Sequence, residues 1–213
     1  MTASPSDRAF RIAVLASGGG TNLQAILDQL HGRGEVEVVG VVSDKPDARA
    51  LERAREAGVG TGVFPTGEYE SREVRDAAIG DWLEERGVEL VVLAGYMQLL
   101  SVEFVGRFRG RAINVHPALL PSFPGLEAVQ QALDHGAKVT GVTVHFVDEG
   151  VDSGPIILQQ AVPVPASRDR EELEEEIHAV EHTLLPEAIR LIAAGRARID
   201  EANPRLVVTD PES

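Results

Sequence analysis

The chain has 213 residues, of which 43% are hydrophobic and 25% charged, as is usual for a globular protein with a buried core. Its formal net charge of −14, from 34 acidic and 20 basic residues, excludes the long-range basic field that attracts nucleic acids and anionic membranes. There is no cysteine, which excludes disulfides, thiolate nucleophiles and cysteine-based metal sites and is typical of a reducing cytoplasm.

Short apolar runs alternate with helical patterns through the first half of the chain. We expect strands at 11–16, 36–42, 63–64, 89–94 and 111–115, and helices at 22–30, 48–57 and 72–86. Buried strands separated by helices are typical of a parallel, doubly wound sheet.

The pattern changes after Pro117. A loop and a helix at 126–133 precede two long strands, 139–147 and 155–164, which indicate an antiparallel extension, and a long helix follows at 170–194. We therefore expect one α/β domain over 9–200, with a Rossmann-like, doubly wound, mainly parallel sheet. Its halves divide at about 110, and a tail, 201–213, is expected to fray from Asn203.

A run of three glycines, Gly18–Gly20, lies between the first strand and the first helix. Glycines let the backbone approach an anion, and the N–H groups that open a helix bind phosphate. No Gly-Lys-Ser/Thr follows, and Leu23 stands where a dinucleotide fingerprint needs its third glycine. Asp44 at the end of the second strand keeps a dehydrogenase open, because a carboxylate there can hold a ribose. A tight turn with only a structural role is the other alternative.

Asn114 and His116 stand two residues apart at the end of a strand, so both side chains point to one face while Val115 points to the core. An amide and an imidazole side by side suit carbonyl chemistry. Both can donate to a developing oxyanion, and the imidazole can carry a proton. A structural histidine is the alternative at His116.

A carboxylate partner is expected from the flexible loop that joins the two long strands. Asp148, Glu149 and Asp152 are the three candidates there. Any of them beside His116 would favour the charged imidazolium. Glu181 is of separate interest, because it lies at the edge of the apolar stripe of the last helix, four residues from both Ile177 and Leu185.

Several segments, in order and spacing, resemble the phosphoribosylglycinamide formyltransferases, the folate-dependent glycinamide ribonucleotide transformylases. They are 17–24 (SGGGTNLQ), 93–100 (LAGYMQLL), 113–117 (INVHP) with 119–125 (LLPSFPG), and 144–158 (VHFVDEGVDSGPIIL). The similarity spans about residues 10–200. Asn-x-His-Pro with a distal Asp-x-Gly-Pro is specific to the folate-dependent formyltransferases, and the SGGGTN turn narrows the resemblance to the glycinamide ribonucleotide branch.

The resemblance implies transfer of a formyl group from 10-formyltetrahydrofolate to the amine of glycinamide ribonucleotide, in purine biosynthesis and without a metal. It makes Asn114, His116 and Asp152 the catalytic residues. The residues implied to bind the ribonucleotide are Gly19, Gly20, Thr21, Asn22, His178 and Glu181. Those implied to bind the folate are Arg72, Met97, Gln98, Leu99, Leu100, Val147, Glu149 and Val151. The family also implies a cis peptide before Pro121.

This chain departs from the family at Gln98, where many members carry a basic residue, and near Glu127, where they carry a histidine. Other formyl-folate enzymes remain as alternatives: a methionyl-tRNA formyltransferase, expected to be longer and to have a basic second domain, or a formyltetrahydrofolate hydrolase, expected to carry an extra N-terminal regulatory domain. A nucleotide-sensing Rossmann module would leave the catalytic residues without a role. We expect a cytoplasmic monomer or homodimer that acts on small molecules, not on nucleic acid or membranes.

Overall fold

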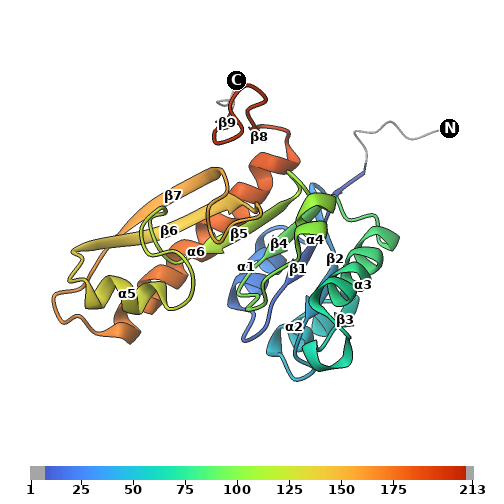
Figure 1. Cartoon of the computed structure of the whole chain (residues 1–213), viewed down its shortest axis with the longest axis horizontal. Coiled ribbons are helices and arrows are strands. Elements are labelled where there is room, and N and C mark those ends of the chain that lie inside the picture. The colour runs from blue at the N-terminus through green and yellow to red at the C-terminus, as the bar shows by residue number, and fades with distance from the viewer. Residues whose placement is uncertain (1–7, 210–213) are drawn as a thin grey trace. The chain divides into compact units, whose positions relative to one another are not determined.

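The computed structural model describes residues 8–209, and the chain divides into two compact units, Met1–Phe104 and Val105–Ser213. The first unit runs from blue to green in Figure 1 and the second from green to red. The division lies inside the short helix α4 (Val102–Arg107), near the expected boundary at 110. The sequence did not predict α4, because so short a segment shows no helical periodicity.

The first unit is built on four parallel strands, as expected. Their order in the sheet is β3-β2-β1-β4, with bounds β1 (Phe10–Leu15), β2 (Val36–Ser43), β3 (Thr61–Val63) and β4 (Leu90–Leu93). β1 and β4 are buried along most of their length, and Ile12, Val14, Leu90 and Val92 have no exposed surface. A continuous apolar strand of this kind is covered on both faces, which explains the runs seen in the sequence.

The helices of the first unit lie on the two faces of its strands, and the connections after β1 and β4 carry most of its candidate residues. The helices are α1 (Thr21–Gln29), α2 (Arg49–Glu56), the 3₁₀ turn η2 (Thr66–Glu68) and α3 (Arg72–Glu85). Right-handed crossovers put α1 and α2 on one face of the strands and α3 on the other. The strand order reverses between β1 and β4, and ligands bind at the carboxyl ends of strands at such a switch point. The glycine turn follows β1, and the 94–101 segment follows β4.

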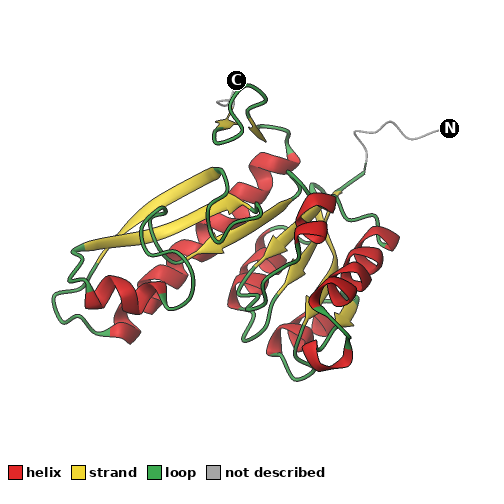
Figure 2. Cartoon of the chain, viewed as in Figure 1, coloured by secondary structure: helices red, strands yellow, loops and turns green. Residues whose placement is uncertain are grey.

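The second unit carries the antiparallel extension. β5 (Ala112–His116) pairs antiparallel with β6 (Val139–Phe146), which pairs antiparallel with β7 (Ile156–Pro163). The helices α5 (Ala128–Asp134) and α6 (Arg170–Ala193) complete the unit (Figure 2). The α/β class is therefore confirmed, with parallel strands in the first unit and antiparallel strands in the second.

The segment expected to fray from Asn203 is ordered in part. β9 (Val207–Thr209) pairs antiparallel with β8 (Ala197–Ile199), so the expectation of fraying is wrong for these residues. Strands of three residues show too little alternation to be recognised in a sequence. Residues 210–213 lie outside the described part of the chain.

α6 is the long helix expected near the end of the chain. Its first turn is capped by Asp169, whose carboxylate accepts from the backbone N–H groups of Glu171 and Glu172 at 2.8 and 3.1 Å. Its buried stripe packs on β6 and β7 and carries Glu181 with it. Within residues 8–209, no helix is both long and apolar enough to cross a membrane.

Candidate active site

The glycine turn is shaped by α2. Gly20 has φ +69°, and a Cβ there would lie 2.8 Å from the Cα and Cβ of Ala50. The backbone N–H of Ala50 donates to the Gly18 carbonyl at 3.1 Å, and Arg53 Nε donates to the Gly19 carbonyl at 2.9 Å. Gly20 was expected to be glycine because of a nearby anion, whereas the contact seen here is with α2.

This arrangement leaves the turn ready for an anion. In a trans peptide the N–H points opposite to the preceding C=O. With the Gly18 and Gly19 carbonyls held by α2, the N–H groups of Gly19 and Gly20 point away from α2. Gly20 also begins α1 without a capping side chain, and the first turn of α1 has no acidic residue, so the positive end of its dipole is not neutralised. The turn is therefore suited to an anion such as a phosphate, with Thr21 and Asn22 following in the first turn of α1.

The segment after β4 holds four of the residues expected to bind folate. Met97 and Leu99 are exposed, while Gln98 and Leu100 are half-buried. The Met97 backbone N–H donates to Ser17 Oγ at 2.9 Å, which ties the segment to the start of the glycine turn. Arg72, also in this unit, is exposed at the start of α3 and pairs with Glu73 at 3.4 Å.

Gln98, the departure from the family, has a partner inside the unit. Its Nε2 donates to Asp44 Oδ2 at 2.8 Å, and Asp44 is buried. The carboxylate that would hold a ribose in a dehydrogenase is thus engaged by a side chain of the same unit. Together with Leu23, buried in α1, this weighs against dinucleotide binding.

The second unit brings Asn114, His116 and Asp152 together. Asn114 and His116 lie on β5, and Asp152 lies in the loop between β6 and β7. Asn114 Nδ2 donates to Asp152 Oδ1 at 3.2 Å, and His116 Nδ1 lies 3.3 Å from Asp152 Oδ2. The three predicted residues therefore form one cluster, with Asp152 as the carboxylate among the three loop candidates.

Asp148 binds groups within the β6–β7 loop, whereas Asp152 belongs to the cluster with Asn114 and His116. Its Oδ1 accepts from the Gly150 backbone N–H at 3.0 Å and from Ser153 Oγ at 2.8 Å, which closes the loop on itself. Asp152 stands in this closed loop at φ +51°, a left-handed conformation that is uncommon outside glycine. A strained conformation of this kind is typical of a functional side chain.

His116 has an acceptor at each ring nitrogen. Nδ1 faces Asp152, and Nε2 lies 2.8 Å from the carbonyl oxygen of Phe123. Only a doubly protonated imidazolium could donate to both acceptors at once. The ring is almost fully buried.

The loop that carries Phe123 is anchored by β6. Thr143 Oγ1 donates to the Ala118 carbonyl at 2.7 Å and accepts from the Leu120 backbone N–H at 3.1 Å. Thr143 stands opposite His116 in the strand register, so the loop is held directly beside the imidazole. The expected cis peptide between Leu120 and Pro121 is confirmed.

The carboxyl of Asp152 is held in its charged form. Burial opposes its ionisation, but the His145 ring at 3.6 Å, the backbone N–H of Gly125 and the charge of His116 together lower its pKa below the ordinary value. The Gly125 N–H donates to Oδ2 at 2.8 Å. Asp152 therefore remains an anion that can orient His116.

His145 was missed by the sequence prediction. It stands opposite Asn114 in the strand register, and its Nε2 lies 3.3 Å from Asn114 Nδ2 and 3.6 Å from Asp152 Oδ1. Its Nδ1 lies 2.8 Å from the Phe146 carbonyl. His145 lies within the segment 144–158 that resembles the family, but only the register of the β5–β6 pair shows that it faces Asn114.

The remaining predicted residues of this unit lie on the β6–β7 loop and on α6. Val147 is half-buried, and its N–H donates to the Ala112 carbonyl at 2.9 Å, whereas Glu149 and Val151 are exposed. Glu181 is 5% exposed, and His178 is exposed. A carboxylate buried this deeply is not part of a solvent-exposed polar face of the helix.

His178 stacks on a second histidine. Its ring centroid lies 6.3 Å from that of His182, with 9° between the ring planes. Burial, and then the charge of His178, lower the pKa of His182. The turn of α6 that carries Glu181 therefore also carries two imidazole side chains, His178 before Glu181 and His182 directly after it.

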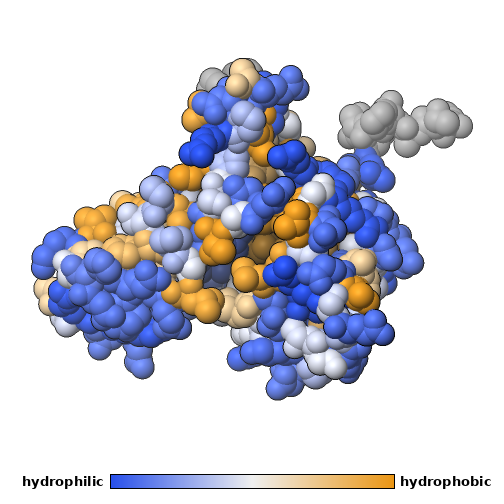
Figure 3. Space-filling model, viewed as in Figure 1, coloured by the Kyte–Doolittle hydropathy of each residue, from blue (hydrophilic) through white to orange (hydrophobic). Residues whose placement is uncertain are grey.

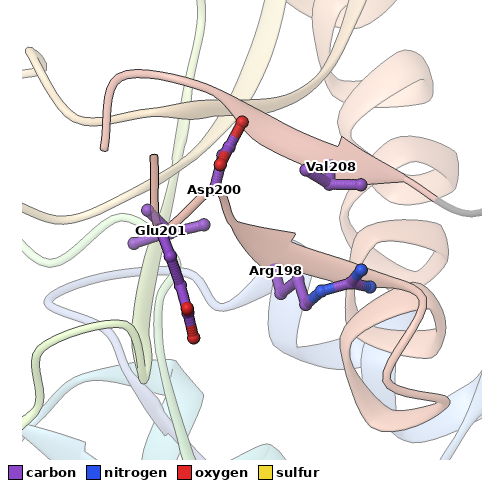
Figure 4. Close-up of a pocket in the computed structure, with 5 residues that line it drawn as sticks. Arg198, Asp200, Glu201 and Val208 are labelled. Atoms are coloured by element: carbon purple, nitrogen blue, oxygen red, sulfur yellow. The ribbon is translucent and has the colours of Figure 1, made fainter. Parts of the chain in front are cut away.

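A cavity of about 350 Å³ lies at the C-terminal hairpin, away from these residues. It is lined by Arg198, Ile199, Asp200, Glu201 and Val208, and it is open and polar (Figure 4). None of the predicted site residues lines it. Within residues 8–209, no three histidine, aspartate or glutamate side chains are grouped so that they could hold a metal ion.

Comparison with known proteins points to one family. The model of the formyl transferase family matches residues 10–189. Phosphoribosylglycinamide formyltransferase of Haemophilus influenzae is 42% identical over 192 residues, which cover 90% of this chain and 91% of that protein. The crystal structure of glycinamide ribonucleotide transformylase 1 from Symbiobacterium toebii is 52% identical and superposes with a TM-score of 0.91 over 95% of each chain.

Longer relatives contain a similar segment. The trifunctional purine biosynthetic protein adenosine-3 of Drosophila melanogaster is 45% identical over 197 residues, which cover 91% of this chain. This chain spans only 15% of the length of that relative.

Proposed function

The chain belongs to the formyl transferase family, in the branch of the phosphoribosylglycinamide formyltransferases, and we propose how its residues divide that reaction between two sites. The family takes its formyl group from a formyl-folate, and this branch delivers it to glycinamide ribonucleotide in purine biosynthesis. We infer that the folate is 10-formyltetrahydrofolate. The observation that carries the assignment is the convergence of Asn114, His116 and Asp152 within hydrogen-bond distance.

The glycine turn holds the phosphate of the ribonucleotide. The acidic chain does not steer a phosphate toward itself, so binding depends on short-range contacts. The outward N–H groups of Gly19 and Gly20 and the uncapped start of α1 supply them. Thr21 and Asn22 complete this set in the first turn.

The Asn114–His116–Asp152 cluster performs the transfer. The neutral amine attacks the formyl carbon, and the carbonyl oxygen becomes an oxyanion. The oxyanion accepts a hydrogen bond from His116 Nε2, in place of the Phe123 carbonyl oxygen. It also accepts from Asn114 Nδ2, in place of His145, which makes the longer of the two contacts of this amide nitrogen. The bond from the formyl carbon to N10 then breaks, and the amine proton passes to N10 with the help of Asp152. The products are N-formylglycinamide ribonucleotide and tetrahydrofolate.

Glu181 accepts from the glycyl amine and keeps it positioned, with His178 beside it. The folate lies against a set of mainly apolar residues and backbone groups: Arg72, Met97, Gln98, Leu99, Leu100, Val147, Glu149 and Val151. The Gln98 side chain is already held by Asp44, so this residue offers its backbone to the folate. No step of this mechanism requires a metal.

We also propose the type of substrate, the cellular location and the oligomeric state of the enzyme. The net charge of −14 suits small-molecule substrates and disfavours nucleic acid. We place the enzyme in the cytoplasm, as a monomer or homodimer.

Direct transfer without an acyl-enzyme can be tested by mass spectrometry. The protein is mixed with isotopically labelled formyl-folate, first alone and then with glycinamide ribonucleotide. We expect an unchanged protein mass in both mixtures and one labelled product per folate consumed in the second, with no binding of NAD in a parallel titration. A protein that gains the mass of a formyl group from the folate alone would contradict direct transfer. A protein that binds NAD and forms no product would overturn the function.

A further inference from the structure

Two adjacent residues of α3, Arg75 and Asp76, form an ion pair inside the first unit. They are 3% and 1% exposed, and Arg75 Nη2 and Nε lie 2.7 and 2.9 Å from Asp76 Oδ1. Neighbouring residues on a helix point in different directions, so such a contact requires the arginine to fold back. Removing two charges from water is costly, and well-packed apolar residues usually stabilise a fold as well. Stability alone is therefore a poor explanation for the pair.

Both residues also bind the backbone of the segment after β4. The Ser101 N–H donates to Asp76 Oδ2 at 2.6 Å, and Arg75 Nη2 donates to the Leu99 carbonyl at 3.4 Å. This part of the segment belongs to no strand, so its buried backbone groups need side-chain partners. Ser101 is buried in turn, and its Oγ accepts from the Phe104 N–H at 3.2 Å. The ion pair thus fixes the end of the segment from beneath.

The other side of the segment faces outward. Met97 and Leu99 are 57% and 62% exposed, whereas Tyr96 before them and Ser101 after them are buried. Figure 3 shows that apolar residues, in orange, form patches between hydrophilic ones on the face in view. The charges below also act on Tyr96: burial raises the pKa of its hydroxyl, and Arg75 opposes that rise. The segment therefore presents apolar side chains on a backbone that is held rigidly from one side.

Resting on the proposed function, in which residues 97–100 bind the folate, we propose that Arg75 and Asp76 are a positioning pair that preorganises this segment for the folate co-substrate. Neither residue touches the folate. A surface that is already ordered loses less conformational freedom when a ligand binds, so its affinity is higher. Loss of the pair should weaken folate binding and leave the chemical step and the ribonucleotide site unchanged.

The test is the double variant Arg75→Met/Asp76→Leu. Removing one partner alone would strand a buried charge and destabilise the protein. The double change removes both charges and introduces apolar side chains, of which leucine has the branching of aspartate and methionine has nearly the volume of arginine. We expect a rise of about tenfold in the Kd of a non-reactive folate analogue and in KM for the formyl-folate. The kcat at saturating folate and the KM for the ribonucleotide should stay within about twofold, and the melting temperature within about 5 °C.

The matched control is Glu85→Leu/Arg86→Met, which removes an adjacent acid–base pair from the other end of α3, where the two groups are 3.9 Å apart and more exposed. We expect this variant to bind the analogue as the wild type does. An equal loss in the control, or a fall in kcat with unchanged KM in the test variant, would overturn the positioning role.

Hydrogen exchange separates this inference from the proposed function. The amides of residues 97–101 should exchange faster in the test variant, without any ligand, and at the wild-type rate in the control. Unchanged exchange overturns the inference, whether or not the protein binds folate. A wild type that does not bind the analogue overturns the assignment of the segment to folate, and the positioning role with it.

Discussion

The glycine turn after β1 and the Asn114–His116–Asp152 cluster differ in what they are made of. The turn offers backbone N–H groups, and its shape depends on missing side chains and on two carbonyls that α2 holds. The cluster consists of side chains whose polar atoms bind one another, with an acceptor at each nitrogen of His116. The first site should therefore be sensitive to added volume, and the second to lost charge and lost donors.

The largest effect is expected from His116→Ala, which removes a donor from the side-chain site. We expect kcat to fall on the order of 10²-fold or more, as loss of an oxyanion donor does. Both KM values should change little, because the glycine turn and residues 97–100, which we propose to bind the phosphate and the folate, are untouched. Steady-state kinetics with each substrate varied measures this. His31→Ala, a histidine outside both sites, is the control, and a variant with normal kcat and raised KM would refute the role of His116.

The same contrast explains how much could be predicted from the sequence. The turn is contiguous, so Gly18–Gly20 between a strand and a helix could be identified as a candidate phosphate site, with a dehydrogenase and a purely structural turn left open. On β5, alternation placed Asn114 and His116 on one face. The cluster also draws on Asp152, 38 residues from Asn114, and composition left three loop carboxylates open. Family resemblance, and then the loop geometry, selected Asp152.

Other features depend on tertiary contacts that local pattern does not show. His145 faces Asn114 only because of the β5–β6 register, and the Phe123 carbonyl reaches His116 only because Thr143 anchors the loop. For Gly20, the phosphate explanation overlooked Ala50, whose helix begins well after the turn. The short elements α4, β8 and β9 escaped because periodicity needs more residues than they have.

The backbone site can be probed with two glycines that differ in their surroundings. In Gly20→Val, a branched side chain meets Ala50 at positive φ, so we expect a loss of about 2–4 kcal/mol in the free energy of unfolding. In Gly19→Val, the new Cβ meets no described atom within 4 Å, so stability should stay within about 1 kcal/mol. The KM for the ribonucleotide should rise about tenfold in Gly19→Val, because the added volume stands where we propose that the phosphate binds.

Urea unfolding and calorimetric titration with ribose 5-phosphate and a folate analogue measure both variants. Equal stability of the two would show that α2 does not impose the glycine at position 20. Loss of folate binding in Gly19→Val, with normal binding of the phosphate compound, would mean that the two substrates are placed the wrong way round.

The smallest effect concerns pH, and it divides the two sites by their chemistry. The turn has no titratable side chain, so its affinity for a phosphate compound should follow only the ionisation of the ligand.

Asp152 has a lowered pKa in the folded protein. Its charge therefore adds stability that is complete above the unfolded pKa of about 3.9 and is lost as the pH falls through the lower folded value. Asp152→Asn cannot titrate and has no such contribution. The difference in unfolding free energy between wild type and variant should be largest near neutral pH and shrink below about pH 4. Urea unfolding across this range, with the ¹³C shift of the Asp152 carboxyl as a direct titration, measures it. A difference that stays constant with pH would mean that the carboxyl has no preferred charged state in the fold, and the cluster would then differ from the turn in its donors alone.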